Sequence, residues 1–308
     1  MIVEPDPSVL KAFWQEATDG LGLKQAKPAG HFHFGDTAEL ASDLVDEMLN
    51  GTKRATAGLV AEMEADGDKL PEEGDLWTVV DGGGEPRLVI RTLEIRRAPF
   101  RKVDEAFAWD EGEGDRSLAW WREAHLDCFR RSCRRISIRF SEDLEVLFER
   151  FDVLWPKDAA ERLLLRRPCT ESQWSVYHRL RRNLFERYLP DLTYDPDFPD
   201  NWTKDVFHFG MVSADEMLGC LQIRWLSATE ASLHLVAIEE RRRGQGIGRR
   251  MLLEGEAFVR TNERRLIRVF AEPEAEGFYR RLGFENGADW TLKPLGAGAA
   301  PLKKTLTT

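Results

Sequence analysis

The stretch that decides the fold of the second half of the chain is Arg243-Gly244-Gln245-Gly246-Ile247-Gly248. It follows the apolar run Leu233–Ile238 and precedes a helix predicted from Ile247 to about Arg260. The start of a helix exposes unpaired backbone N–H groups and the positive end of the helix dipole, which together favour an anion. The glycines let such an anion approach the main chain without a Cβ in the way.

Several kinds of phosphate-binding loop place glycines at the start of a helix. The dinucleotide pattern G-x-G-x-x-G fails here, because Arg249 occupies its last position when Gly244 is first. The P-loop pattern fails because no Gly-Lys-Ser/Thr follows. A pyrophosphate cradle of another kind remains, beside the plainer interpretation that these glycines only form a tight turn.

Two motifs in this half resemble the GNAT superfamily of N-acyltransferases. Arg243, Gly246 and Gly248 fit the family's cofactor loop, Arg/Gln-x-x-Gly-x-Gly/Ala. Further along the chain, Ala275–Phe284 (AEGFYRRLGF) is similar to the family's A-x-x-F-Y-x-x-x-G-F helix. The resemblance spans roughly Arg162 to Leu306. It implies an acetyl-coenzyme-A-dependent enzyme that acetylates an amine on a small molecule or a macromolecule.

The resemblance also implies roles for particular residues. The backbone of Val236, Ala237 and Ile238 would pair with the pantetheine arm of acetyl-coenzyme A. Tyr279 would be the general acid toward the departing thiolate, because a phenol with a reference pKa of about 10 is protonated at neutral pH. The alternative for Tyr279 is an aromatic packing residue. Main-chain N–H groups of Gln245 to Arg249 would bind the pyrophosphate. The cofactor-binding residues of the loop are Arg243, Gly244, Gln245, Gly246, Ile247, Gly248 and Arg249.

His234 is the candidate general base, at the point where serotonin N-acetyltransferase and its relatives have a histidine. Histidine suits proton transfer at neutral pH. The alternation Leu233-His234-Leu235 predicts that its ring lies on the face opposite its leucine neighbours. A histidine at the edge of the core is the alternative. Glu272 stands where the family often has asparagine, which is a departure from its pattern.

Motifs in the first half of the chain resemble the ASCH family, whose fold is similar to the RNA-binding PUA barrel. The main motifs are Gly51–Thr56 (GTKRAT) and Glu111–Leu118 (EGEGDRSL). The match extends from about Leu10 to Trp155. Its supporting positions are His33-Phe34-Gly35-Asp36, Asp81 with Pro86, Ile90-x-Thr92 and Pro99-Phe100.

Some small ASCH proteins are amidohydrolases that deacetylate N4-acetylcytidine with a lysine, a threonine and a glutamate, and others are proposed to bind or cut RNA. The K-x-x-T spacing fits Lys53 and Thr56, with Glu111 as the expected third member and Glu113 as its rival. Thr56 would be the nucleophile, Lys53 its activator, and the carboxylate would orient both. Alternatively, Lys53 and Arg54 are solvated charges and the glutamates cap the following helix.

Helix and strand signals place these motifs in two domains, at 8–156 and 160–308, on either side of Lys157–Ala160. The expected fold class is mixed α/β or α+β. The first domain would be a PUA-like β-barrel with helices, and the second a mixed, largely antiparallel sheet flanked by helices. The first-domain elements are a helix capped by Asp36 and closed by Gly51, strands at Leu76–Val80, Leu88–Ile95 and Leu144–Val153, and a helix from near Arg116. The second-domain elements are a strand at Arg162–Arg167, a helix capped by Thr170, strands at Val206–Val212, Leu218–Trp225, Ala231–Ile238 and Leu266–Ala271, a helix at Ala275–Leu282, a flexible connection at Gly296–Ala300 and a strand at Leu302–Leu306.

Composition narrows the classes of function. The formal net charge of −10 disfavours the binding of polyanions. Binding of RNA would therefore need a local basic patch such as Arg130–Arg139 or Arg241–Arg243. No apolar run is long enough to span a membrane, and the first residues lack a secretory signal, which predicts a cytoplasmic protein. The four cysteines show no zinc-ligand spacing, so we expect reduced thiols and no metal.

Three functions are therefore compared. The first is an acetyl-coenzyme-A-dependent N-acetyltransferase with an ASCH module that recognises RNA or a nucleoside. The second is an ASCH-type amidohydrolase on N4-acetylcytidine or RNA, with the GNAT half as a regulatory domain that binds acetyl-coenzyme A. The third is an RNA-binding protein without catalysis.

Overall fold

The computed structural model of the chain describes residues 2–290 and 298–307. They divide into two compact units, residues 1–162 and 163–308. Gly296 and Ala297, which belong to the predicted flexible connection, lie outside the described residues. Among the helices of the described residues, none has the length and apolar character to cross a membrane.

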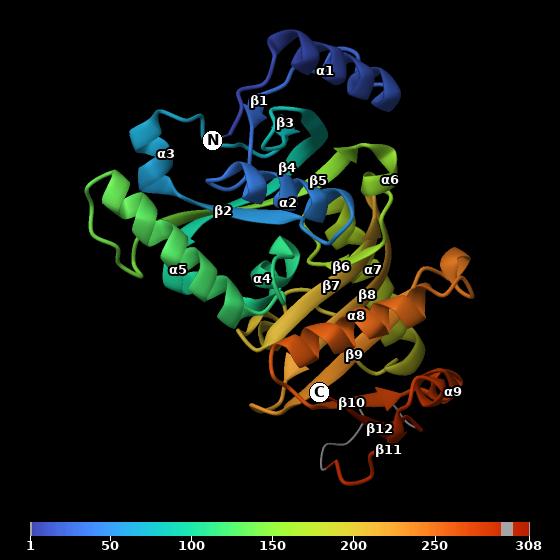
Figure 1. The fold of residues 1–308 in the computed structure, drawn as a ribbon. Helices are drawn as coiled ribbons and strands as arrows, with labels where there is room; N and C mark the ends of the chain where they lie inside the picture. Colours follow the sequence, from blue (N-terminus) through green and yellow to red (C-terminus); the bar gives the residue numbers. More distant parts are fainter. Residues whose placement is uncertain (1, 291–297, 308) are drawn as a thin grey trace. The chain divides into compact units, whose positions relative to one another are not determined.

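The first unit is a five-stranded sheet with helices around it (Figure 1). The strand order is β1-β3-β4-β5-β2, and all neighbours are antiparallel except β1 and β3. Its elements are α1 (Pro7–Leu21), β1 (Gly30–Phe32), α2 (Ala38–Leu49), β2 (Ala55–Leu59), α3 (Val60–Asp66), β3 (Leu76–Val80), β4 (Pro86–Pro99), η1 (Phe100–Lys102), α4 (Glu105–Glu111), α5 (Leu118–Arg135), β5 (Glu145–Trp155) and α6 (Lys157–Ala160).

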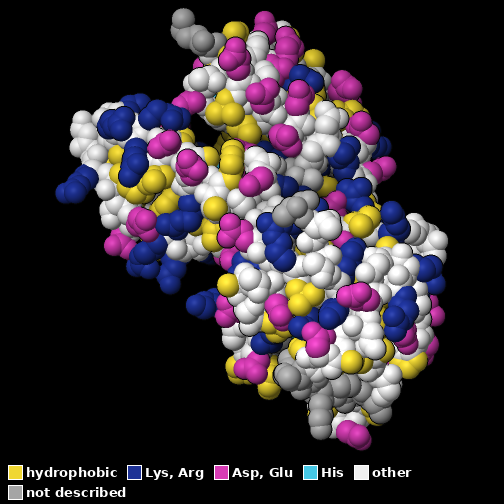
Figure 2. All heavy atoms as spheres, turned by 60° about the horizontal axis from the view of Figure 1, so that its bottom comes forward, with side chains coloured by type: hydrophobic (Ala, Val, Ile, Leu, Met, Phe, Trp, Pro, Cys, Tyr) yellow, Lys and Arg dark blue, Asp and Glu magenta, His cyan; other side chains and the backbone are white. Residues whose placement is uncertain are grey.

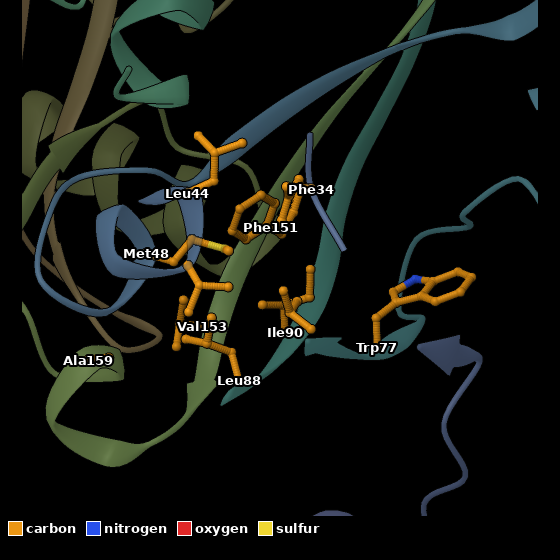
Figure 3. Close-up of a cluster of buried hydrophobic side chains, with 11 residues drawn as sticks. Phe34, Leu44, Met48, Trp77, Leu88, Ile90, Phe151, Val153 and Ala159 are labelled. Carbon is orange, nitrogen blue, oxygen red and sulfur yellow. The ribbon is translucent and has the colours of Figure 1, made fainter. Parts of the chain in front are cut away.

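This sheet is curled into a half-barrel, and its two longest strands explain the curl. The β4–β5 ladder shifts register between Val89 and Ile90 and again between Thr92 and Glu94. Such irregularities bend a strand and increase its twist. On one face α2 contributes Leu44 and Met48 to a buried cluster with Phe151 of β5 (Figure 3). A second cluster packs α4 and α5 against other residues of β2 and β5.

Seven elements of this unit are absent from the sequence prediction: α1, β1, β2, α3, η1, α4 and α6. Local signals for α1 were available, because Asp6 caps it, Pro7 opens it and Gly22 ends it in a left-handed conformation. The predicted cap at Asp36 is wrong. Thr37 caps α2 instead, with its side-chain oxygen 3.2 Å from the Leu40 nitrogen.

The second unit is a seven-stranded sheet in the order β11-β12-β10-β9-β8-β7-β6. Every neighbouring pair is antiparallel except β9 and β10. The expected fold class is confirmed for both units. The elements here are β6 (Leu164–Arg166), α7 (Glu171–Tyr188), η2 (Pro199–Trp202), β7 (Val206–Ser213), β8 (Glu216–Trp225), β9 (Glu230–Ile238), η3 (Glu240–Arg242), α8 (Ile247–Thr261), β10 (Leu266–Ala271), α9 (Pro273–Arg281), β11 (Glu285–Asn286) and β12 (Ala300–Thr305).

Two irregularities of β9 create the space for a site. The parallel ladder with β10 ends at the pair Leu233–Val269, so within the described residues no ladder pair joins 234–238 to β10. The ladder with β8 slips between Cys220 and Gln222, and Leu235 has a positive φ of 49°. This bulge breaks the predicted alternation, so the side chain of Leu235 does not simply oppose that of His234.

Candidate functional site

The glycine loop combines a left-handed backbone at two glycines with open space beside it. Gly244 and Gly246 adopt φ angles of 76° and 82°, which residues with a Cβ rarely adopt. A Cβ added at either position would meet no atom within 4 Å, so the space beside the loop is open. Within the described residues, no backbone N–H from Gly244 to Arg249 donates a hydrogen bond. The start of α8 thus presents free amides to open space.

Other residues of the predicted cradle hold the loop in shape. The Nε of Arg243 donates to the Ile238 carbonyl over 3.3 Å, and the side chain of Gln245 donates to the Arg241 carbonyl over 3.1 Å. Gly248 serves close packing, because its added Cβ would lie 3.4 Å from the ring of Phe278. The glycine loop and the Ala275–Phe284 motif therefore contact each other, because Phe278 belongs to the F-Y pair of that motif on α9.

A cavity of about 770 Å³ lies where β9 and β10 lose their ladder. It brings together His234, Val236 and Tyr279 of the predicted site. Ala237, Ile238 and the loop residues 243–249 are not among its lining residues. The cavity therefore contains three of the predicted site residues, and the glycine loop does not line it.

Tyr279 lies on α9 with 5 % of its surface exposed, and it lines the cavity. Burial raises the pKa of its hydroxyl above the ordinary tyrosine value, so the hydroxyl is protonated at neutral pH. Within the described residues, this hydroxyl has no hydrogen-bond partner in the protein. Its proton is thus available to a ligand, although its ring also packs against Phe284.

His234 lines the same cavity and is half-buried. Burial, together with the positive charges of Arg224 and Arg181, lowers the pKa of His234 to about 4. Its Nε2 lies 2.7 Å from the hydroxyl of Ser232. The ring is therefore neutral at pH 7 and has a lone pair that accepts a proton. Glu272 also lines the cavity, where burial and then Glu274 raise the pKa of its carboxyl.

The cavity also contains a polar group that the sequence analysis did not identify. Arg181 of α7 is 2 % exposed and lines the cavity with Asn201 and Gln222. Its hydrogen bonds go to the hydroxyls of Tyr177 and Tyr194 and to the side-chain oxygen of Asn201. A signal was present, because Arg181 falls inside the apolar stripe formed by Trp174, Tyr177, Leu180 and Leu184. A charged residue at such a position indicates a buried cation.

In the first unit, the structure brings Lys53 together with both candidate glutamates. The Nζ of Lys53 lies 2.5 Å from Glu113 and 3.6 Å from Glu111, and Lys53 is 1 % exposed. Gly112 makes this possible, because its Cβ would lie 2.7 Å from the Lys53 backbone nitrogen. Burial opposes the charge on Lys53, but Glu113 and Glu111 raise its pKa. The alternative of a solvated Lys53 is wrong.

Glu111 also has a partner that sequence reasoning missed. The Nε2 of His125 lies 3.3 Å from Glu111, and its Nδ1 lies 3.0 Å from the Trp121 carbonyl. Both ring nitrogens face acceptors, so His125 is doubly protonated. Burial alone would lower the pKa of His125, but the Glu111 carboxylate raises it. The Trp121 indole donates to the other oxygen of Glu111, whose pKa is lowered by His125 and Lys53 against the effect of burial.

Thr56 is not joined to this cluster by a hydrogen bond among the described residues. It lies on β2 opposite Glu149 of β5. Glu149 accepts a hydrogen bond from Thr92 over 2.6 Å, and burial raises its pKa to about 7. The suggestion that the glutamates cap the next helix is wrong, because Ser117 caps α5.

Several arginines of the two predicted basic patches form ion pairs with nearby carboxylates. Arg131 pairs with Asp36, and Arg135 pairs with Glu62 and Asp66. Arg241 and Arg242 both contact Glu216. Figure 2 shows basic and acidic side chains interspersed over the face that it draws. Neither run therefore forms a field of a single sign strong enough to indicate RNA binding by itself.

Comparison with protein families assigns both units. Residues 30–155 match the ASCH domain model, and residues 205–286 match the acetyltransferase (GNAT) domain model. No curated protein matches the chain.

Solved structures resemble the two halves separately. An ASCH domain from Lactobacillus crispatus is 29 % identical, with 50 % of this chain and 99 % of that chain covered and a TM-score of 0.45. An acetyltransferase from Streptococcus agalactiae is 13 % identical, with 47 % and 98 % covered and a TM-score of 0.37. An N-acetylglutamate synthase from Neisseria gonorrhoeae, complexed with coenzyme A and L-arginine, is 13 % identical, with 47 % and 34 % covered and a TM-score of 0.39. The chain thus combines an N-terminal ASCH domain with a C-terminal domain of the GNAT acetyltransferase family.

Proposed function

We propose that the protein is an acetyl-coenzyme-A-dependent N-acetyltransferase that acetylates an amine. One observation carries the proposal: His234 and Tyr279 line the same cavity, at the end of β9 where its ladder with β10 stops. One of these side chains is neutral and accepts a proton, and the other is protonated and donates one. Acyl transfer to an amine needs both functions.

The residues present fit acetyl-coenzyme A. The free amides from Gly244 to Arg249 would hold the pyrophosphate, with the positive end of α8 behind them. The β9 backbone from Val236 to Ile238 has no ladder partner on the β10 side in the described part of the chain, so it would pair with the pantetheine arm. Arg249 is exposed in the first turn of α8 and would add a positive charge.

The chemistry then divides between the ligand and the chain. When bound, acetyl-coenzyme A supplies a thioester carbon that bonds to the amine nitrogen as its C–S bond breaks. His234 would take the proton that the amine must lose. Tyr279 would give its hydroxyl proton to the departing thiolate. The apolar walls of the cavity would exclude water and so limit hydrolysis.

The glycine loop provides the test of this proposal. The variant Gly246→Glu forces a side chain into a left-handed backbone position and places a carboxylate where the pyrophosphate would bind. We expect calorimetry to show that acetyl-coenzyme A binds at least about 100-fold more weakly, or ~3 kcal/mol. Unchanged affinity would exclude the loop as the pyrophosphate site.

Gly22→Glu is a matched control in the other domain. Gly22 ends α1 with a φ of 72°, and a Cβ there also meets no atom within 4 Å. The same backbone strain is therefore introduced far from the loop in sequence. Acetyl-coenzyme A should bind this variant as it binds the wild type.

We also propose that the two domains span residues 8–156 and 160–308. A second site, for RNA or a nucleoside, would lie in the ASCH domain. It is supported by Lys53 being held between two glutamates by the backbone at Gly112. Lys53 would serve as a fixed cation beside the substrate, with Thr56 as the candidate nucleophile of an amidohydrolase. Deacetylation of N4-acetylcytidine that survives Tyr279→Phe but is lost with Thr56→Val, which leaves the ion pairs of Lys53 in place, would support this activity.

A further inference from the structure

The cavity of the GNAT domain contains a buried positive charge without a negative partner. The guanidinium of Arg181 donates to Tyr177 over 2.9 Å, to Tyr194 over 3.2 Å and to the Asn201 side chain over 3.4 Å. In the described part of the chain, no carboxylate forms an ion pair with it. Burying an unpaired charge is strongly unfavourable, so its retention calls for a functional reason.

The hydrogen-bond network shows that these partners are neutral. His208 must donate from Nε2 to the Asn201 carbonyl, 2.8 Å away, because a carbonyl only accepts. Burial lowers the pKa of His208 to about 4, so its Nδ1 accepts from the Tyr177 hydroxyl. Burial also raises the pKa values of Tyr177 and Tyr194. None of these groups offsets the charge of Arg181.

The guanidinium keeps capacity for another acceptor. It has five N–H donors, and its three protein partners use three of them. Arg224 adds a second cation to the cavity wall, and its only protein acceptor among the described residues is the Asp200 carbonyl, 2.8 Å away. The rest of the wall mixes polar and apolar residues. The carboxylates of Asp195, Asp200 and Glu272 are part of it, and its apolar part includes Leu184, Phe185, Leu189, Leu226, Leu233 and Leu235.

We propose that the amine acceptor carries its own anionic group, a carboxylate or a phosphate, bound by Arg181 and Arg224. This inference rests on the proposed transferase and names the class of its acceptor. The planar forks of two arginines match the paired oxygens of such a group. An apolar amino acid has all the required parts: an amine, a carboxylate and a hydrophobic side chain.

The position of the arginines near the candidate base fits this class of acceptor. The charges of Arg224 and Arg181 both act on His234. In an amino acid the carboxylate is one carbon away from the amine, so an anion bound at the arginines brings the amine toward His234. The bound anion would also offset the positive charges and make His234 a better base.

The test compares amines that differ only in the anionic group. We would measure kcat/KM of the full-length protein for L-phenylalanine against 2-phenylethylamine, and for O-phosphoethanolamine against ethylamine. We expect the anionic member of at least one pair to be preferred by about 10- to 100-fold, as expected for a charged hydrogen bond. The first pair reports on a carboxylate and the second on a phosphate.

Variants then connect the preference to the arginine. Arg181→Met should reduce the preference to near unity, and Arg181→Lys should keep part of it. Arg182→Met is the matched control, because Arg182 is an exposed neighbour on α7 that does not line the cavity. Calorimetry with N-acetyl-L-phenylalanine gives a readout without turnover, and Arg181→Met should weaken this binding whereas Arg182→Met should not.

Each outcome supports or overturns the inference. Equal or better transfer to the uncharged amines in both pairs overturns it and leaves the transferase standing. A preference that survives Arg181→Met and Arg224→Met overturns the assignment to these arginines. Failure of acetyl-coenzyme A to bind the wild type instead removes the proposed function itself.

Discussion

Two clusters of buried charge, one in each domain, differ in whether the charge has a counter-ion. In the ASCH domain, Lys53 and His125 face Glu111 and Glu113, so two cations meet two anions. In the GNAT domain, Arg181 faces only neutral partners and borders a cavity of about 770 Å³. A cluster with equal numbers of cations and anions supplies its own counter-ions, whereas a buried cation without a counter-ion can bind an anionic ligand. The same contrast appears in two histidines: the pKa of His125 is raised, and the pKa of His234 is lowered to about 4.

The largest expected effect tests whether a buried charge with counter-ions contributes more to stability than one without. Lys53→Met removes the cation between buried Glu111 and partly buried Glu113 and leaves the Glu111 carboxylate with His125 alone, so we expect a loss of about 3–5 kcal/mol in the free energy of unfolding. Arg181→Met removes a charge that has no counter-ion, so we expect a change of less than about 1.5 kcal/mol. Urea unfolding followed by hydrogen exchange of peptides from each domain would measure both. Equal losses would contradict the comparison.

The next effect concerns the proton donor on the cavity wall. Tyr279→Phe removes the hydroxyl and keeps the ring, so we expect kcat to fall by about 100-fold while acetyl-coenzyme A binds normally. Tyr188→Phe is the matched control, because Tyr188 also lines the cavity but its hydroxyl already donates to Glu274 over 3.3 Å. Steady-state kinetics and calorimetry separate the two effects. Similar kcat values for both variants would remove Tyr279 as the acid.

The pH dependence of stability should have opposite signs in the two domains. The folded pKa values of His208 and His234 are about 4, so the stability that these neutral rings give the GNAT domain is lost as the pH falls from 6.5 toward 4. At pH 5 the loss is about 2 kcal/mol for each ring.

The stability that His125 gives the ASCH domain is present below about pH 6.5 and is lost as the pH rises through its raised folded pKa. Urea unfolding at pH 5, 7 and 9 with peptide-resolved exchange tests this. His125→Gln should flatten the alkaline slope of the ASCH domain, whereas His31→Gln, at an exposed position of the same domain, should not. Parallel slopes in both domains would refute the assignment of the charges.

The smallest expected effect is on the acid limb of the pH profile of kcat/KM. Protonated His234 cannot accept a proton, so kcat/KM should fall as the pH decreases through about 4. Arg224→Met removes a positive charge that acts on this ring, so the acid limb should move to higher pH. Arg182→Met should leave the limb in place. A limb that stays fixed in Arg224→Met would show that His234 does not control it.

The sequence predicted elements with strong local signals and missed those with weak ones. The cap at Thr170 is confirmed, with its hydroxyl accepting from Gln173 over 3.2 Å. The strand at Leu266–Ala271 is observed with the predicted bounds. β2 was missed because Ala55–Leu59 is short, contains a glycine and is paired by β5 rather than by its own propensity. Thr37 caps α2 in place of Asp36. Asp36 instead forms an ion pair with Arg131, a residue far away in the sequence, so only the folded chain shows this contact.

What the sequence determined by itself is local: the glycines that accept left-handed backbone at Gly244 and Gly246, the helix that follows them, and the lysine and glutamates of the ASCH motifs. Tertiary structure decided which of these residues meet. The end of the β9–β10 ladder opens the cavity, the bulge at Leu235 sets its wall, and the fold brings Arg181 to it and His125 to Glu111. The physical reason is that charge balance is a property of neighbours in space, and local patterns along the chain do not contain it.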